Sequence, residues 1–231
     1  MKKRLSLMLL AMLAPLLAIS PGTLDARQKH SLDAVLGAMD KASREFVDMV
    51  AAIERETVTV FINHSRIESG RMYFARGGDH SRVRVSLTDP ARKDFLIDDG
   101  KVRIYNPGTN VLEEIGLGEH ADKVELMVVG FGTSGEDLLH YYDVKLAAEE
   151  IVDGTSVSVL DLAPRDPDVA RHFTSIRLWM DQQRWIPVQT RATQSSGDYL
   201  TVRFSNVVIN GGVPNSAFSL DLPDDVQILR P

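Results

Sequence analysis

Three glycines near the middle of the chain could cradle a phosphate. Gly130, Gly132 and Gly135 have the G-x-G-x-x-G spacing of dinucleotide-binding turns, and they follow an apolar run. Glu150 stands about 20 residues further on, where such folds place a ribose-binding acid. The helix expected after Gly135 is too short to cross over to a parallel strand, which a dinucleotide fold requires. We therefore interpret the motif as a glycine-rich turn.

Other residue types capable of chemistry do not form a metal or catalytic pattern. None of the six histidines stands three or four residues from another, so no helix presents a paired metal-binding face. Acidic pairs such as Asp98 and Asp99 are sequence neighbours, and neighbours on a strand point to opposite faces. The chain has no G-x-S-x-G elbow, and its lack of cysteine excludes disulfides, thiolate metal sites and a cysteine nucleophile. We expect no catalytic residues, no metal and no cofactor.

The elements that position these residues are a helix followed by many strands. Ser31 can cap a helix, and apolar residues at helical spacing predict that it runs over residues 31–50. Alternating apolar residues then indicate strands, and turns such as residues 98–101 indicate hairpins. The later strands are expected near residues 110–115, 141–149, 155–163, 173–180, 186–194 and 199–209. We predict a mainly β protein with helices (α+β), in which about eleven antiparallel strands form a curved sheet or incomplete barrel.

Two segments could cover such a sheet as a helical lid. One is the helix over residues 31–50, and the other is residues 118–140, in which Ser134 begins a short helix with acidic residues in its first turn. The apolar residues expected to face the sheet from this lid are Leu36, Met39, Leu126 and Met127.

The apolar strand residues predict either a packed core or a lined cavity. Both give the same alternation, and a packed core is the default for an apolar face. The sharper alternative is a hydrophobic cavity inside an incomplete barrel that admits acyl chains. The candidate ligand-binding residues are Val58, Val60, Ile62, Met72, Phe74, Val83, Val85, Leu87, Val102 and Ile104.

The N-terminus and the overall charge indicate export. Met1-Lys2-Lys3-Arg4 precedes an apolar run over residues 5–19, which is the pattern of a secretory signal peptide. We expect residues 1–26 to be removed and residues 27–231 to form a single, soluble, periplasmic domain; an uncleaved anchor is the alternative. The net charge of −6 argues against nucleic-acid binding. Without cysteine the chain is not itself a lipoprotein.

Four segments, in order along the chain, carry a family resemblance. Residues 68–76 resemble the S-G-x-[LMI]-x-[FWV]-x-R strand of the LolA family, the periplasmic carriers of outer-membrane lipoproteins. Residues 95–107 resemble its I-x-x-D-G-K…Y-[DN]-P segment. Residues 202–207 and 218–223 resemble its closing F-x-[FL]-x-[ND]-[IV] and F-x-[FL]-x-x-P elements. The resemblance covers nearly all of the chain after the expected signal peptide.

The resemblance implies a half-barrel of eleven strands with a helical lid and a hydrophobic cavity. It implies a monomeric carrier that receives the acyl chains of lipoproteins, or similar lipids, from an inner-membrane ATP-driven release complex. The carrier hands them to an outer-membrane lipoprotein acceptor. Arg76 matches the family arginine that hydrogen-bonds backbone carbonyls of the lid and locks it closed. The sequence departs from the family where Gly77 and Gly78 replace a proline, and where Val85 and Val102 stand at positions that are usually aromatic.

Two alternatives to a carrier remain open. The first is a periplasmic domain of the same fold that senses lipid or lipoprotein, as in related regulators of envelope stress. Those regulators carry a second domain, and we expect none here because the chain ends at Pro231, shortly after Pro223. The second alternative is an enzyme on the same scaffold, for which the sequence offers no constellation of residues.

Overall fold

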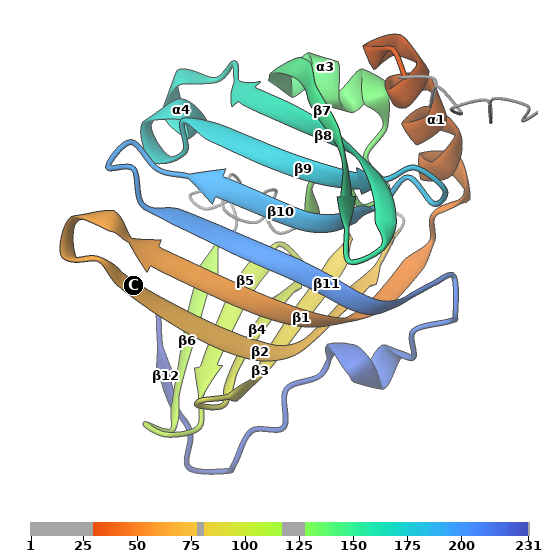
Figure 1. The fold of residues 1–231 in the computed structure, drawn as a ribbon. Coiled ribbons are helices and arrows are strands. Elements are labelled where there is room, and N and C mark those ends of the chain that lie inside the picture. The colour runs from red at the N-terminus through yellow and green to blue at the C-terminus, as the bar shows by residue number, and fades with distance from the viewer. Residues whose placement is uncertain (1–29, 78–80, 117–127, 231) are drawn as a thin grey trace, which may run out of the picture.

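One open sheet of twelve strands dominates the computed structural model, which describes residues 30–77, 81–116 and 128–230. The strands are ordered β12-β6-β5-β4-β3-β2-β1-β11-β10-β9-β8-β7 (Figure 1). Their bounds are β1 Asp48–Thr59, β2 His64–Ala75, β3 Arg82–Asp89, β4 Lys93–Asp98, β5 Lys101–Asn106, β6 Val111–Gly116, β7 Tyr142–Val152, β8 Thr155–Pro164, β9 Ser175–Asp181, β10 Pro187–Thr193, β11 Tyr199–Ile209 and β12 Gln227–Leu229. The helices are α1 Leu32–Glu45, α3 Gly135–Tyr141 and α4 Pro167–His172, with short 3₁₀ turns η1 Val60–Ile62 and η3 Asn215–Phe218.

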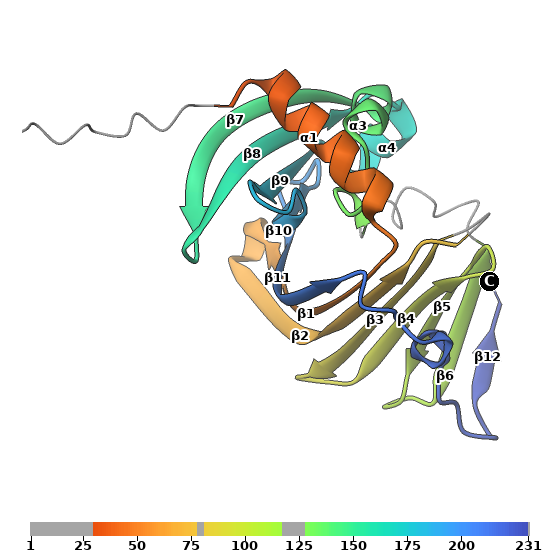
Figure 2. The same ribbon diagram turned by 90° about the vertical axis from the view of Figure 1, so that its right-hand side faces the viewer.

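The sheet curves strongly, so that it has an inner and an outer face (Figure 2). The inner face carries Ile53 of β1 and its same-side neighbours, and α1 and α3 lie together near the β7–β9 end. This architecture confirms the prediction of an α+β incomplete barrel. None of the helices within the described ranges has the length and hydropathy that a membrane-spanning helix needs.

The structure adds one strand to the predicted antiparallel set. β12 pairs with β6 in the parallel direction, whereas every other pair in the sheet is antiparallel. The three residues of β12 are all exposed, so they carry no buried alternation that a sequence pattern could detect. Asn110 holds this end of the chain, because its carbonyl accepts from the Gln227 N–H and its amide donates to Asp225.

The first helix is shorter than predicted, because the chain changes to a strand soon after Glu45. Ser31 caps α1 as expected, with its hydroxyl accepting from the Ala34 N–H at 3.2 Å. The Asn210 side chain then bridges the junction, accepting from the Val47 N–H at 2.8 Å and donating to the Glu45 carbonyl at 2.7 Å. From Asp48 onward the backbone pairs with β2 and β11 as a strand. Long-range strand pairing therefore overrides the local helical spacing.

Two clusters of buried side chains cover the inner face. The first joins α1 and α3 to β8 and β9, and the second places Phe46 and Phe131 against β1 to β4. On the outer face, residues 213–220 pack Phe218 against Leu96 and Ala75. The lid, which we define as α1 together with residues 128–141, is therefore part of the core.

Candidate functional site

A cavity of about 450 Å³ opens on the inner face of the sheet. Residues of β1 to β6 and of β9 to β11 contribute to its wall, together with flanking positions, because alternate residues of each strand point to the inner face. The wall consists of Ile53, Arg55, Thr57, Met72, Val85, Phe95, Ile97, Val102, Ile104, Ile115, Phe173, Ile176, Thr190, Ala192, Gln194, Leu200, Val202 and Phe204. Most of these side chains are apolar, so the cavity suits an apolar ligand.

Four of the ten strand residues predicted to bind ligand line this cavity, namely Met72, Val85, Val102 and Ile104. Phe74, Val83 and Leu87 lie in the adjoining core cluster and are at most 3% exposed. The inner face is thus packed at one end and hollow at the other. Both the packed-core and the cavity interpretations describe part of it.

The predictions for Val58, Val60 and Ile62 do not agree with the structure. In β1 the cavity is lined by Ile53, Arg55 and Thr57, so Val58 has the opposite parity. Val60 and Ile62 lie in η1, the turn between β1 and β2, and are 51% and 63% exposed. The alternation of residues 57–62 predicted a strand, but a 3₁₀ turn and the left-handed Asn63 interrupt it.

Of the four apolar lid residues predicted to face the sheet, two are buried against it and two lie outside the described residues. Leu36 and Met39 of α1 are buried against β8 and β9, at 6% and 1% exposure. Leu126 and Met127 lie outside the described residues. The short helix predicted after Ser134 is confirmed as α3, and Ser134 and Asp137 form its capping box.

Arg76, at the end of β2, reaches both parts of the lid. Its Nη1 donates to the Ser43 carbonyl of α1 at 2.9 Å, and its Nη2 donates to the Gly132 carbonyl at 2.6 Å. The planar guanidinium can serve two carbonyls at once. These are the contacts that a lid lock requires, while the locking role itself stays a prediction.

The glycine-rich turn explains how the Arg76 guanidinium comes so close to the backbone of the lid. Gly132 has a φ of +66°, and a Cβ there would lie 2.6 Å from both the Arg76 Nη2 and the Phe46 Cδ1 atoms. Only glycine fits this approach. The helix that follows, α3, leads into β7, which pairs antiparallel with β8. The motif therefore has no parallel crossover around it and serves the lid.

Arg55 is a cavity residue that hydrophobic periodicity missed. It stands directly opposite Glu68 in the β1–β2 register, and its Nη1 lies 3.7 Å from the buried Glu68 carboxylate. Arg66 pairs with the other carboxylate oxygen at 2.5 Å. Burial lowers the pKa of the Arg55 guanidinium, and the Glu68 charge opposes this shift only in part.

Similarity to known families covers this same sheet. The family described as MucB/RseB N-terminal domain matches residues 48–222, from the start of β1 to the segment after η3. The chain belongs to the MucB/RseB N-terminal domain family. This match confirms the LolA-like resemblance, because the family falls within the LolA superfamily.

A curated relative is similar in sequence, and two solved structures are similar in fold. A curated relative from Chromohalobacter salexigens, named outer-membrane lipoprotein carrier protein, is 24% identical over 165 residues, which are 70% of each chain. A crystal structure of MucB is 19% identical with a TM-score of 0.52, and the match covers 82% of this chain and 63% of MucB. An uncharacterized conserved protein from Thermus thermophilus is 13% identical with a TM-score of 0.55, covering 87% of this chain and 100% of that one. The chain therefore spans less than two thirds of the MucB chain that it matches.

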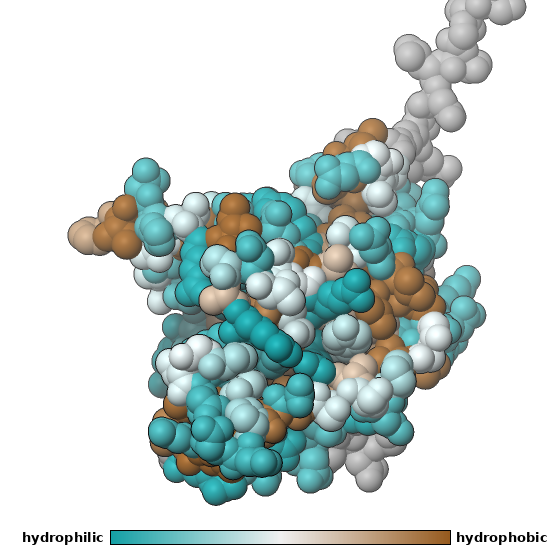
Figure 3. All heavy atoms as spheres, turned by 90° about the horizontal axis from the view of Figure 1, so that it is seen from below, coloured by the Kyte–Doolittle hydropathy of each residue, from teal (hydrophilic) through white to brown (hydrophobic). Residues whose placement is uncertain are grey.

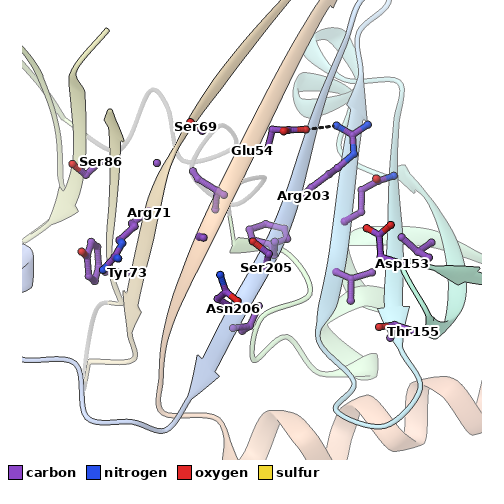
Figure 4. Close-up of a pocket in the computed structure, with 18 of the residues that line it drawn as sticks. Glu54, Ser69, Arg71, Tyr73, Ser86, Asp153, Thr155, Arg203, Ser205 and Asn206 are labelled. Atoms are coloured by element: carbon purple, nitrogen blue, oxygen red, sulfur yellow. Dashed lines mark hydrogen bonds and ion pairs between the residues drawn. The ribbon is translucent and has the colours of Figure 1, made fainter. Parts of the chain in front are cut away.

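A larger groove, of about 920 Å³, lies on the outer face of the sheet. Figure 4 shows Glu54 beside Arg203, with Asp153 on the Arg203 side of the groove and Arg71 and Tyr73 of β2 on the opposite side. Arg203 donates to Glu54 at 2.9 Å, so part of the charge in this groove is already paired. A polar groove of this kind does not suit an acyl chain, and the inner cavity is the better candidate site. Within the described residues no three His, Asp or Glu side chains cluster in a way that could hold a metal.

Proposed function

We propose that this domain is a periplasmic carrier that holds acyl chains of lipoproteins, or of similar lipids, in the inner cavity. The observation that supports the proposal is an apolar cavity of about 450 Å³ on the same face of the sheet as a lid that Arg76 joins to β2. The volume lies within the range of small-molecule sites, about 300–1,000 Å³. The relative named outer-membrane lipoprotein carrier protein gives independent support.

Burial of an acyl chain would supply the binding energy. Each buried methylene contributes about 0.8 kcal/mol, so about ten of them contribute ~8 kcal/mol before the costs of association. The lid hydrogen bonds of Arg76 oppose opening, and release therefore needs a partner that stabilises the open state. We infer that an inner-membrane ATP-driven release complex loads the carrier and that an outer-membrane acceptor unloads it. We propose binding and transport without catalysis, in a chain whose residues 1–26 serve as an export signal.

Lipid binding can be tested with the full-length gene expressed in a Gram-negative host. The exported protein is purified without detergent, extracted with organic solvent and analysed for lipid, and its binding of a diacylated peptide is measured. Val102→Trp places a large side chain in the cavity wall and should weaken binding. Val60→Trp makes the same change in the exposed η1 turn and should bind as the unaltered protein does. Absence of both co-purified lipid and peptide binding would disprove the carrier.

A regulatory role is the second candidate, because the family is that of the MucB/RseB N-terminal domain. In that role the same cavity would sense a lipid and change the affinity for a protein partner. A carrier moves bound lipid from donor to acceptor vesicles, whereas a sensor retains it. A vesicle-to-vesicle transfer assay with a fluorescent diacylated peptide therefore separates the two functions.

A further inference from the structure

The wall of the inner cavity carries a buried hydrogen-bond donor, the Nε of Arg55, that no described residue pairs with. Among the residues that line it, Arg55 alone carries an ionisable side chain. Its Nε is buried and has no hydrogen-bond partner among the described residues. Leaving such a donor unpaired is unfavourable, and buried polar groups in folded proteins normally have partners.

The charged neighbours of Arg55 leave this part of the cavity net positive, and none of them hydrogen-bonds its Nε. The 3.7 Å separation between Nη1 and Glu68 is an ionic contact, longer than a hydrogen bond. Glu68 is bound more closely by Arg66, at 2.5 Å, so one carboxylate faces two guanidinium groups. Lys93 adds a further cation, because its Nζ lies 5.1 Å from the centre of the Phe95 ring, and the Arg55 guanidinium lies 5.8 Å from the same ring.

This arrangement selects against two classes of ligand. A hydrocarbon without oxygen would leave the Arg55 Nε unpaired, and it would gain nothing from the cations around Phe95. An amphiphile with a cationic head would meet Arg55 in the cavity wall, with Lys93 beside the same Phe95 ring, and like charges repel. A ligand with an oxygen acceptor next to its apolar chain can accept a hydrogen bond from the Arg55 Nε and bury its chain against the apolar wall.

We propose that Arg55 binds the carbonyl or carboxylate oxygen at the head of an acyl chain whose tail lies in the cavity. The proposal rests on the proposed lipid-carrying function and deepens it, because it names the recognised group and the residue that recognises it. A free fatty acid and an ester-linked lipid share this acceptor. The fork of the guanidinium suits a carboxylate, while a single donor such as Nε suffices for an ester carbonyl.

The test compares three fluorescent probes that differ in their head groups. They are cis-parinaric acid, its methyl ester, and diphenylhexatriene, which has no oxygen. Arg55→Met keeps the length and apolar volume of the side chain and removes its donors. Arg71→Met is the matched control, because Arg71 is exposed and lines the groove on the outer face. All binding is measured on the full-length protein after export.

Arg55→Met should weaken binding of the acid at least about tenfold, which corresponds to ~1.4 kcal/mol, and leave diphenylhexatriene binding unchanged. If Arg55→Met also binds the methyl ester more weakly, Arg55 recognises a carbonyl oxygen. If only the binding of the acid is weakened, Arg55 recognises a carboxylate. Arg71→Met should bind all three probes like the unaltered protein. If Arg55→Met binds the acid as the unaltered protein does, the inference about Arg55 is wrong, while the proposed lipid-binding role of the cavity is unaffected. If the unaltered protein binds none of the probes, the lipid-carrying function fails as well.

A second measurement needs no variant and so does not depend on its folding. The Arg55 Nε–H resonance of the ¹⁵N-labelled protein should shift when cis-parinaric acid is added and should not shift with diphenylhexatriene. A resonance that responds equally to both probes, or to neither, overturns the proposed contact.

Discussion

Replacing Arg76 by leucine removes the two side-chain hydrogen bonds that join the lid to β2. Both acceptors are backbone carbonyls, of Ser43 and Gly132, at 2.9 and 2.6 Å. A hydrogen bond from a charged donor contributes about 1.5–3 kcal/mol, and we take about 1 kcal/mol each here because Arg76 is exposed to solvent. The lid therefore loses ~2 kcal/mol, and its opening equilibrium should increase about 30-fold, since 1.4 kcal/mol is tenfold.

Native-state hydrogen exchange measures this change directly. Backbone amides of α1 and of residues 128–141 should exchange about 30-fold faster in Arg76→Leu. Arg76→Lys should show a smaller increase, because an ammonium on a flexible stem lacks the fork that serves two carbonyls. Arg71→Leu, on the outer face, should exchange as the unaltered protein does. Unchanged exchange of the lid in a folded Arg76→Leu protein would refute the locking role, and normal cargo transfer would remove Arg76 from the transport cycle.

Other consequences can be checked by simpler measurements. Gly70→Ala would place a Cβ 2.1 Å from a backbone oxygen of β3, so chemical denaturation should show a free energy of unfolding lower by at least about 2 kcal/mol. In α1, the added Cβ of Gly37→Ala meets nothing within 4 Å, so the free energy of unfolding should rise by about 0.5–1 kcal/mol. Hydrogen bonds from Arg230 and neighbouring basic side chains lower the pKa of the Glu114 carboxyl to about 2. The stabilisation from this contact is therefore fully present above the ordinary carboxyl pKa and is lost as the pH falls towards about 2; a ¹³C titration with a midpoint near the ordinary value would contradict it. Phe61→Ser should change the free energy of unfolding by less than about 0.5 kcal/mol, because Phe61 is 96% exposed; a larger loss would show that the turn packs against the protein.

The hairpins and the starts of α1 and α3 follow closely from local sequence signals. Turn residues with a left-handed preference mark the hairpins, as at Asp99 and Gly100, which both have positive φ. The start of α1 and the start of α3 each have a capping side chain, which a sequence displays directly. The end of α1 could not be predicted in this way, since the strand that replaces it depends on partners more than a hundred residues away, such as Asn210.

The β1–β2 turn shows a limit of periodicity. Val60 and Ile62 continue the alternation of β1, yet they lie on a projecting tip whose apolar side chains are visible at the left of Figure 3, where Figure 1 places this turn. Alternation says that two residues share a face, but it does not say where the strand ends. Neither Asn63 nor its neighbours form a recognised two-residue turn signal, so the turn was not predicted.

A cavity and a packed core differ in what lies opposite the apolar face, and this depends on tertiary structure. In this domain Phe46 and Phe131 fill the space above β1 to β4, while Val102 and Ile104 of β5 line the cavity. The ionisable residue in the cavity wall, Arg55, is not detected by a search for apolar alternation. In the sequence Arg55 is simply a charged residue in a strand; in the structure it faces the cavity with Ile53 and Thr57 and stands opposite Glu68. Its Nε, which no described residue pairs with, is the observation that supports the proposed ligand with an oxygen next to its apolar chain.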